Sequence, residues 1–323
     1  MHRSTQPPEL LDAWLPPRIG RNARLERLTE LIDWTPLADL VADLHAAPRG
    51  RPSYPPLLMV KVLLLQQWYQ ASDPAIEEAL WERLSFRRFV GLGLQDPAPD
   101  HSTISRFRTD LAQAGLAERL FAAVEQQLAA RGVLVQQGTL VDATLVDAQV
   151  RRPRGGKTGD GSPNDPDAAW ARRGRQARFG YKVHLGVDAD SELVRRARLT
   201  PANVNETEVA DELIAGDEAA VYGDAAYGTH ARSARLRALG IEDHLMRRPS
   251  KHHPRLSPAA RRRHARIERV RRPVEHVFGT LKRSYGYQRV RYRGLARNAT
   301  EMWFKLLAYN LRRADRLLRD APA

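Results

Sequence analysis

Hydrophobic and polar positions follow one pattern before Gly132 and another after it. Before Gly132, apolar residues recur at helical spacing behind residues that favour the first turn of a helix. The clearest predicted helices are LLMVKVLLLQQWY after Pro55-Pro56, AIEEALWERL after Asp73-Pro74, and TISRFRTDLAQAGL after Asp100 or Ser102. The pattern predicts an all-helical N-terminal domain over residues 1–132. Several short helices with a Ser-, Thr- and Arg-bearing one near the end are typical of a DNA-binding and dimerisation module, and a plain helical bundle is the alternative.

After Gly132 the chain becomes rich in β-branched residues. We predict strands in VLVQQGTLVDATLVDA, which bends at Gln137-Gly138, and in FGYKVHLGVDAD and ELVRRARLT. The helices NETEVADELIAG and ARSARLRALG then alternate with the short strands AAVYGDAAY and IEDHLMRR. Residues 151–178 are rich in Gly, Pro and Arg and contain few apolar residues, which predicts a long mobile loop.

The final third is predicted to contain two long helices. Ser257 and Pro258 cap a helix through AARRRHARIERVRR, which Pro273 is expected to kink or restart. The closing helix, LARNATEMWFKLLAYNLRRADRLLR, has apolar residues at helical spacing. A run of strands, then strands alternating with helices, then terminal helices predict an α/β (α+β) domain over residues 133–323.

Composition adds a strong positive charge to this picture. The chain has 323 residues, 42% of them hydrophobic, with a net charge of +14 and a pI near 10.5. That balance favours a polyanionic partner, with nucleic acid ahead of an acidic membrane surface. The absence of cysteine excludes a disulfide scaffold, a Cys-ligated metal site and a thiol nucleophile.

The sequence gives no indication of membrane insertion. Its most apolar run, residues 55–65, contains Lys61 and is much shorter than the roughly 20 residues that a membrane-spanning helix needs. The N-terminal segment has no signal-peptide pattern. We therefore expect a cytoplasmic, nucleoid-associated protein without a membrane partner.

Three acidic residues stand where a charge is difficult to explain structurally. Asp142 interrupts the apolar strand TLVDATLV, Asp224 ends the strand AAVYGD, and Glu275 lies in a stretch crowded with arginine. Carboxylates at the ends of buried strands are costly unless they are paired or hold a metal. Three such oxygen donors suit one or two Mg²⁺ ions, with Mn²⁺ as a substitute. A strand-end cap is the alternative for Asp142 or Asp224 alone.

Helical geometry places two cations beside Glu275. At about 100° per residue, Arg271 and Lys282 lie within roughly 40° of Glu275 on one helix face. That face would carry a metal-binding carboxylate and two cations directed at phosphate. A solvated ion-pair face is the alternative.

Residues 247–272 carry eleven Lys or Arg residues and a single acidic residue, Glu268. A solvated charge run is normally of mixed sign, so this segment predicts contact with a phosphate backbone. The predicted nucleic-acid contacts are Arg247, Arg248, Lys251, Arg261, Arg262, Arg263, Arg266 and Lys282.

Four segments resemble blocks of a known family. VDATLVDA, FGYKVHLGVDA, YGDAAYG and RRPVEHVFGTLKRSYGYQRVRYRGLARN resemble the DDE transposases of bacterial insertion sequences, with the insertion-sequence five group as the nearest. The N-terminal YPPLLMVKVLLLQQWYQASD and PDHSTISRFR are also similar to that group. The resemblance runs in collinear order from about residue 45 to 319.

The resemblance implies a ribonuclease-H-like catalytic domain with Asp142, Asp224 and Glu275 as its metal-binding triad. It also implies that Arg271 and Lys282 are the basic companions of the glutamate. Such enzymes often carry Tyr seven residues before the glutamate, whereas this chain has Glu268. That departure puts in doubt only the role of the tyrosine in handling DNA ends.

The expected function is that of a DNA transposase. It would bind the terminal inverted repeats of its element, hydrolyse the phosphodiester at the ends, and join the 3′-hydroxyl to target DNA by metal-dependent transesterification, as a homo-oligomer on double-stranded DNA. One alternative is a metal-dependent nuclease without strand transfer, and another is a non-catalytic DNA-binding protein.

Three further residues have open roles. His184 and His276 flank the motifs and lack the regular spacing of metal-ligand histidines, so packing or phosphate contact is the expected role. Trp170 lies in the predicted mobile loop, where stacking on an unpaired base is one interpretation.

Overall fold

The computed structural model describes residues 18–44, 53–150, 162–173, 176–249 and 255–320. The chain divides into two compact units, one formed by residues 1–130 and 300–323 and the other by residues 131–299. None of the helices in the described ranges combines the length and the apolar character needed to cross a bilayer.

The first unit is all-helical, as predicted. Besides the part of α12 (Leu295–Asp320) that follows residue 299, it contains α2 (Ala23–Glu30), α3 (Thr35–Val41), α4 (Pro56–Tyr69), α5 (Asp73–Glu82), α6 (Leu84–Val90), α7 (His101–Gln113) and α8 (Leu116–Ala130).

The apolar helix α4 forms the centre of this unit. Its side chains are buried on all sides, from Leu58 to Trp68. The indole nitrogen of Trp68 donates to the carbonyl oxygen of Ala308 at 2.9 Å, and the buried Arg108 donates to the Asp73 carboxylate at 3.0 Å. The Trp68 indole and the Arg108 guanidinium are therefore paired inside this core, as buried polar groups require.

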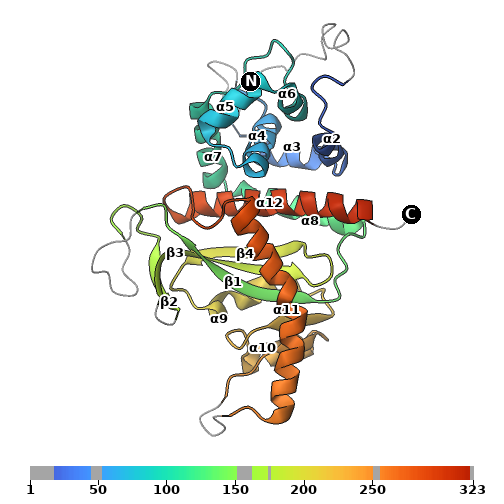
Figure 1. Cartoon of the computed structure of the whole chain (residues 1–323), viewed down its shortest axis with the longest axis vertical. Helices are drawn as coiled ribbons and strands as arrows, with labels where there is room; N and C mark the ends of the chain where they lie inside the picture. Colours follow the sequence, from blue (N-terminus) through green and yellow to red (C-terminus); the bar gives the residue numbers. More distant parts are fainter. Residues whose placement is uncertain (1–17, 45–52, 151–161, 174–175, 250–254, 321–323) are drawn as a thin grey trace. The chain divides into compact units, whose positions relative to one another are not determined.

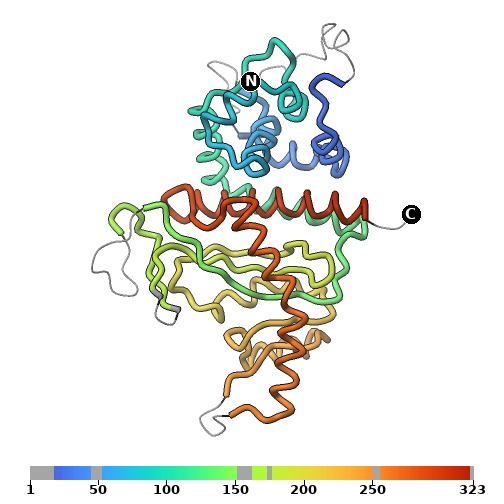
Figure 2. Tube along the Cα trace, in the orientation of Figure 1, coloured from blue at the N-terminus to red at the C-terminus, as the bar shows by residue number. Residues whose placement is uncertain are grey.

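The second unit is built on a mixed sheet. Its strands are β1 (Thr139–Asp147), β2 (Ala169–Arg173), β3 (Gln176–Asp188), β4 (Val194–Pro201), β5 (Ala220–Gly223) and β6 (Glu242–Leu245). The strands β4, β3 and β1 pair antiparallel in that order, and β5 and β6 continue the sheet parallel to β1. The tube in Figure 2 shows β1, β3 and β4 running side by side. This mixed α/β architecture confirms the predicted α/β (α+β) class.

Helices cover both faces of the sheet. The long helix α11 (Pro258–Ser284) packs on β1 and β5, and Figure 1 shows it crossing the sheet. On the other face, Val141 packs with residues of η1 (Ala210–Leu213), which follows α9 (Glu206–Val209), and of α10 (His230–Ala238). Because successive strand residues point to opposite faces, Asp142 points toward α11.

The loop predicted over residues 151–178 is wrong at its C-terminal end. Residues 169–173 form β2, which pairs antiparallel with the start of β3. The ring of Trp170 packs against that of Phe179 with centroids 5.4 Å apart, so this tryptophan belongs to the sheet rather than to a mobile loop. Residues 151–161 lie outside the described residues.

Three other features differ from expectation. The segment VLVQQGTLVDATLVDA forms a single strand, β1, because residues 133–138 lie outside the ladder. Helix α11 continues through Pro273 without restarting, since only one ladder hydrogen bond is lost at a proline and its flanking turns are packed. The predicted division at residue 132 assigned the closing helix wholly to the second domain, whereas its residues from 300 onward group with the helical unit.

Polar side chains of β3 are buried on the face opposite α11. His184 is fully buried, and its Nε2 lies 2.9 Å from Thr200 Oγ1. Lys182, two residues earlier, pairs with Glu206 at 2.9 Å and donates to the carbonyl oxygen of Val204. Burial, together with the Lys182 ammonium, lowers the pKa of His184 to about 4, so this histidine is a neutral core residue.

His184 should make the protein less stable in mild acid. Its pKa in an unfolded chain is about 6.5, so below that pH the unfolded state gains a proton that the folded state does not bind. Urea unfolding of the wild type and of His184→Gln, which keeps a partner for Thr200, measures the effect. We expect the wild type to lose about 2 kcal/mol more than the variant between pH 7 and pH 5. Equal losses would contradict the assignment.

Candidate functional site

Asp142 and Asp224 lie side by side where the ladder between the parallel strands β1 and β5 ends. In the β1–β5 ladder the last paired residues are Val141 and Gly223, and each aspartate is the next residue along its chain. Neighbouring strands are about 4.8 Å apart, so the register alone brings the two aspartates together at this end of the β1–β5 ladder. The structure thus joins two of the three predicted metal ligands.

Local contacts fix both aspartates. The Oδ1 atom of Asp142 accepts from the Ala143 amide at 2.9 Å, and that of Asp224 accepts from the Ala226 amide at 2.8 Å. The chain turns after Asp224, where the Tyr227 amide donates to the Asp224 carbonyl oxygen at 3.1 Å. Gly223 allows this close packing, because a Cβ there would lie 2.8 Å from Val141 Cγ2 and 2.7 Å from Leu245 Cδ2.

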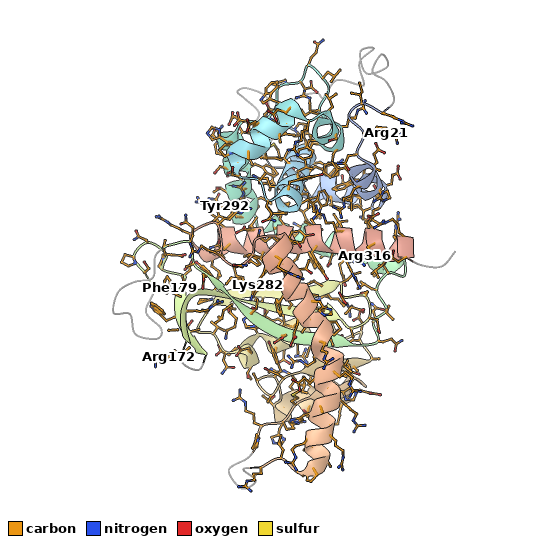
Figure 3. The ribbon with its side chains drawn as sticks, in the orientation of Figure 1. Arg21, Arg172, Phe179, Lys282, Tyr292 and Arg316 are labelled. Carbon is orange, nitrogen blue, oxygen red and sulfur yellow. The ribbon has the colours of Figure 1, made fainter. Side chains whose placement is uncertain are left out.

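One flank of α11 places two cations against the Asp142 face of β1. Arg271 Nη2 lies 3.3 Å from Asp142 Oδ2, and Lys282 Nζ donates to Thr144 Oγ1 at 2.7 Å. Thr144 is two residues beyond Asp142 and therefore points to the same face. Arg271 and Lys282 are eleven residues apart, about 20° from each other around the helix. Figure 3 shows Lys282 on the part of α11 that crosses the sheet.

Glu275 lies one helical turn after Arg271 and is exposed to solvent. In the described part of the chain, no three His, Asp or Glu side chains come close enough together to hold a metal ion. The structure therefore places Glu275 on the flank of α11 that reaches Asp142, without closing the predicted triad into a three-carboxylate cluster.

The chemistry of the aspartate pair fits a divalent cation. Two adjacent carboxylates provide the hard oxygen donors that Mg²⁺ prefers. In the structure, the positively charged Arg271 guanidinium forms an ion pair with Asp142. The Nε–H group of Arg271 is buried and has no hydrogen-bond partner among the described residues, so this arginine retains donor capacity for a further oxygen.

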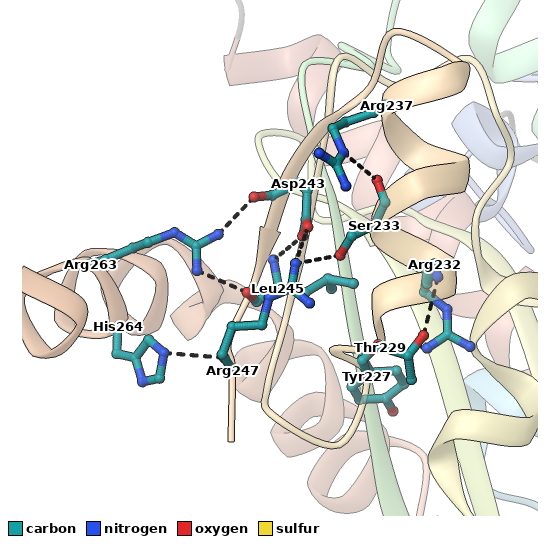
Figure 4. Close-up of polar contacts among 10 residues, drawn as sticks. All are labelled: Tyr227, Thr229, Arg232, Ser233, Arg237, Asp243, Leu245, Arg247, Arg263 and His264. Carbon is teal, nitrogen blue, oxygen red and sulfur yellow. Dashed lines mark hydrogen bonds and ion pairs between the residues drawn. The ribbon is translucent and has the colours of Figure 1, made fainter. Parts of the chain in front are cut away.

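Two arginines of the basic segment are used inside the protein. Arg263 donates to the carbonyl oxygens of Leu245 and Asp243, at 3.0 and 2.7 Å, at the end of β6 (Figure 4). Arg247 pairs with the Asp243 carboxylate at 2.8 Å and donates to the Ser233 hydroxyl. Both were predicted as nucleic-acid contacts, and the structure gives both of them structural partners.

The other predicted contacts remain on the surface. Arg248, Arg261, Arg262 and Arg266 are exposed, the last three on the first half of α11. Lys251 lies outside the described residues. The basic surface, defined here as Arg261, Arg262 and Arg266, is thus carried by the helix that also carries Arg271, Glu275 and Lys282.

Other residues considered from the sequence lie apart from the carboxylate pair or on the surface. His276 is 73% exposed and lies 3.9 Å from Glu192. Glu268, at the position where related enzymes often carry Tyr, is exposed on α11.

The sequence prediction omitted two residues that the structure brings to the site. Thr144 holds Lys282, and its signal was its position two residues after Asp142 in one strand. Tyr227 is fully buried, packs with Val141, the residue before Asp142, and lies three residues after Asp224 in YGDAAYG. Its signal in the sequence was a tyrosine in the predicted turn directly after the candidate ligand Asp224.

The chain matches two family models. Residues 14–110 match the family described as "Transposase domain (DUF772)", and residues 134–311 match the family described as "Transposase DDE domain". The "Crystal structure of the Mos1 Strand Transfer Complex" is 11% identical, covering 78% of this chain and 83% of that one with a TM-score of 0.19. The "Crystal structure of a pre-cleavage Mos1 transpososome" is 10% identical, covering 93% and 98%, also with a TM-score of 0.19.

Arg263 and Arg266 should differ in their effect on stability, although they are neighbours on α11. Arg263→Ala removes two charged hydrogen bonds and leaves two carbonyl groups unpaired, so it should lower the free energy of unfolding by about 1–3 kcal/mol. Arg266→Ala, on the exposed side, should change it by about 0.5 kcal/mol or less. Urea unfolding at one pH compares them. Equal destabilisation would mean that the contacts of Arg263 at the end of β6 contribute nothing to stability.

Proposed function

The chain belongs to the transposase DDE family, since the matching model spans more than half of it, and we propose that it cuts the ends of its element and joins them to target DNA. It is a DDE-type transposase. Its side-by-side aspartates at the end of the β1–β5 ladder, with Arg271 beside Asp142, are the observation that supports cutting at this site.

In this proposal, Asp142, Asp224 and Glu275 hold one or two Mg²⁺ ions. A bound cation supplies Lewis-acid stabilisation of charge on the phosphodiester oxygens and lowers the pKa of a bound water. Glu275 joins the aspartates from α11, whose neighbouring turn already contacts Asp142 through Arg271. Mn²⁺ is the expected substitute, because it prefers similar oxygen ligands.

Arg271 and Lys282 hold the scissile strand. The unused Nε–H donor of Arg271 and the ammonium of Lys282 both lie on the flank of α11 that carries Glu275. Donors on that flank neutralise phosphate oxygens and orient the backbone for in-line attack. Hydrolysis leaves a 3′-hydroxyl, and this hydroxyl then displaces an oxygen at a target phosphodiester without a covalent protein intermediate.

Duplex DNA lies along α11 in the proposed complex. The basic surface of Arg261, Arg262 and Arg266 continues the same helix beyond Arg271, so one rigid element spans from backbone contact to the reacting phosphate. The helical N-terminal unit binds the terminal inverted repeats, and a homo-oligomer pairs the two ends. We also propose that the chain belongs to the insertion-sequence five group of these transposases, which its sequence resembles.

Substituting the carboxylates tests the catalytic assignment. Asp142→Asn, Asp224→Asn and Glu275→Gln should each slow Mg²⁺-dependent cleavage of inverted-repeat DNA by about 1000-fold or more, since loss of a metal ligand removes several kcal/mol of transition-state stabilisation. Binding of the same DNA, measured by gel shift, should persist. Asp147→Asn is the matched control, because Asp147 lies on β1 but on its opposite face.

The same assay separates the proposed function from its alternatives. Joining of a pre-cleaved 3′ end to plasmid DNA is expected from the wild type, and cleavage without joining would assign a nuclease instead. Normal cleavage by any one carboxylate variant removes that residue from the site.

The basic surface should determine the salt dependence of binding. Each phosphate contact contributes about 0.9 to the slope of log K against log salt concentration, so Arg261→Ala/Arg262→Ala/Arg266→Ala should flatten that slope by up to about 2.7. Arg263→Ala serves as the control, because its guanidinium is bound to backbone carbonyls. A slope unchanged in the triple variant would show that this surface does not face DNA.

A further inference from the structure

Tyr227 is held rigidly in the core, against the strand residues that precede the two aspartates. Its side chain is fully buried and packs with Val141 and Leu245, and its Cβ would lie 3.2 Å from a Cβ on Gly223. Its carbonyl oxygen accepts from Arg232 Nη1 at 2.5 Å, which fixes the turn that follows Asp224. The phenol ring therefore has one well-defined position against the strand pair.

The hydroxyl group of Tyr227 has no hydrogen-bond partner among the described residues. A buried hydroxyl without a partner costs free energy, and phenylalanine would fill the same space without that cost. Packing thus accounts for the ring of Tyr227 and leaves its hydroxyl unexplained.

The surroundings of this hydroxyl are acidic. Burial raises its pKa first, and the carboxylates of Asp142, Asp224 and Glu206 raise it further, whereas Arg271 lowers it. The hydroxyl therefore stays protonated and can only gain by donating to a carboxylate. Asp142 and Asp224 act on the hydroxyl more strongly than Glu206, which pairs with Lys182 at 2.9 Å, so the aspartate pair is the acceptor to consider.

We propose that Tyr227 is a positioning residue, whose hydroxyl donates a hydrogen bond to the Asp142–Asp224 carboxylate pair when that pair binds a divalent cation. The inference rests on the proposed function, because it assumes that the pair is a metal site. In the structure Arg271 pairs with Asp142. Once a cation and a substrate phosphate take over these charges, the carboxylates reorient and the buried donor gains its acceptor.

A donor behind a metal ligand fixes the ligand's orientation, and its loss typically weakens metal binding by about 10–100-fold. A hydroxyl that only fills space would leave metal affinity unchanged. The two roles are therefore separated by a measurement of metal affinity that does not depend on catalysis.

The test is a titration of the full-length protein with Mn²⁺ alone, in which electron paramagnetic resonance reports the free ion. Tyr227→Phe should weaken Mn²⁺ binding by about 10–100-fold, with a melting temperature equal to or above that of the wild type. Tyr222→Phe is the matched control, because Tyr222 is a half-buried residue of β5 that stacks on His244 with centroids 4.7 Å apart. It should bind Mn²⁺ as the wild type does.

The variant Asp142→Asn separates a failure of the inference about Tyr227 from a failure of the proposed metal site. If this variant loses Mn²⁺ binding while Tyr227→Phe keeps wild-type affinity, the inference about Tyr227 is wrong and the metal site stands. If Asp142→Asn binds Mn²⁺ as tightly as the wild type, the metal site itself is wrong. Weaker binding by Tyr227→Phe together with a lower melting temperature would also overturn the inference, since it would indicate a structural role.

Discussion

Two carboxylates on neighbouring strands repel each other and require a positive charge close by. The parallel register of β1 and β5 imposes this condition on Asp142 and Asp224, because each aspartate follows one member of the last residue pair of the ladder. The structure meets the condition with Arg271, which pairs with Asp142 from the helix above. Several features of the second unit hold the two aspartates and Arg271 in this arrangement. Gly223 permits the close strand packing, the turn after Asp224 fixes the second carboxylate, and α11 delivers the compensating charge.

Helix α11 is long enough to carry both DNA-binding residues and residues of the candidate site. A single helix from Pro258 to Ser284 carries exposed arginines in its first half and Arg271, Glu275 and Lys282 in its second. Because a helix rises about 1.5 Å per residue, these groups are spread over roughly 30 Å of one rigid element. In this account, the arginines that bind the DNA backbone and the residues that act on the scissile phosphate are therefore held at fixed positions on one helix. The uninterrupted passage through Pro273 matters for this reason, since a restart there would have separated the two halves.

The sequence predicted what depends on local pattern and failed where the outcome depends on tertiary contact. Asp142 and Asp224 were found because a charge in an apolar strand is anomalous, and the flank of Arg271 and Lys282 followed from helical period. Strand β2 was missed because its arginines mask the alternation, and only pairing with β3 makes Trp170 and Arg172 strand residues. Arg263 was assigned to DNA because nothing in a run of arginines tells which one meets backbone carbonyls. Tyr227 looks like any core tyrosine until its hydroxyl is seen without a partner.

The central claim is that Asp142, Asp224 and Glu275 surround one cation site. Iron-directed cleavage tests it most directly, since Fe²⁺ bound in place of Mg²⁺ generates hydroxyl radicals with peroxide and cuts the chain next to the metal. The account predicts cuts close to residues 142 and 224 and in the turn of α11 around residue 275, all suppressed by excess Mg²⁺. Cuts confined to β1 and β5, with α11 intact, would contradict the role of Glu275, and cuts elsewhere would contradict the site.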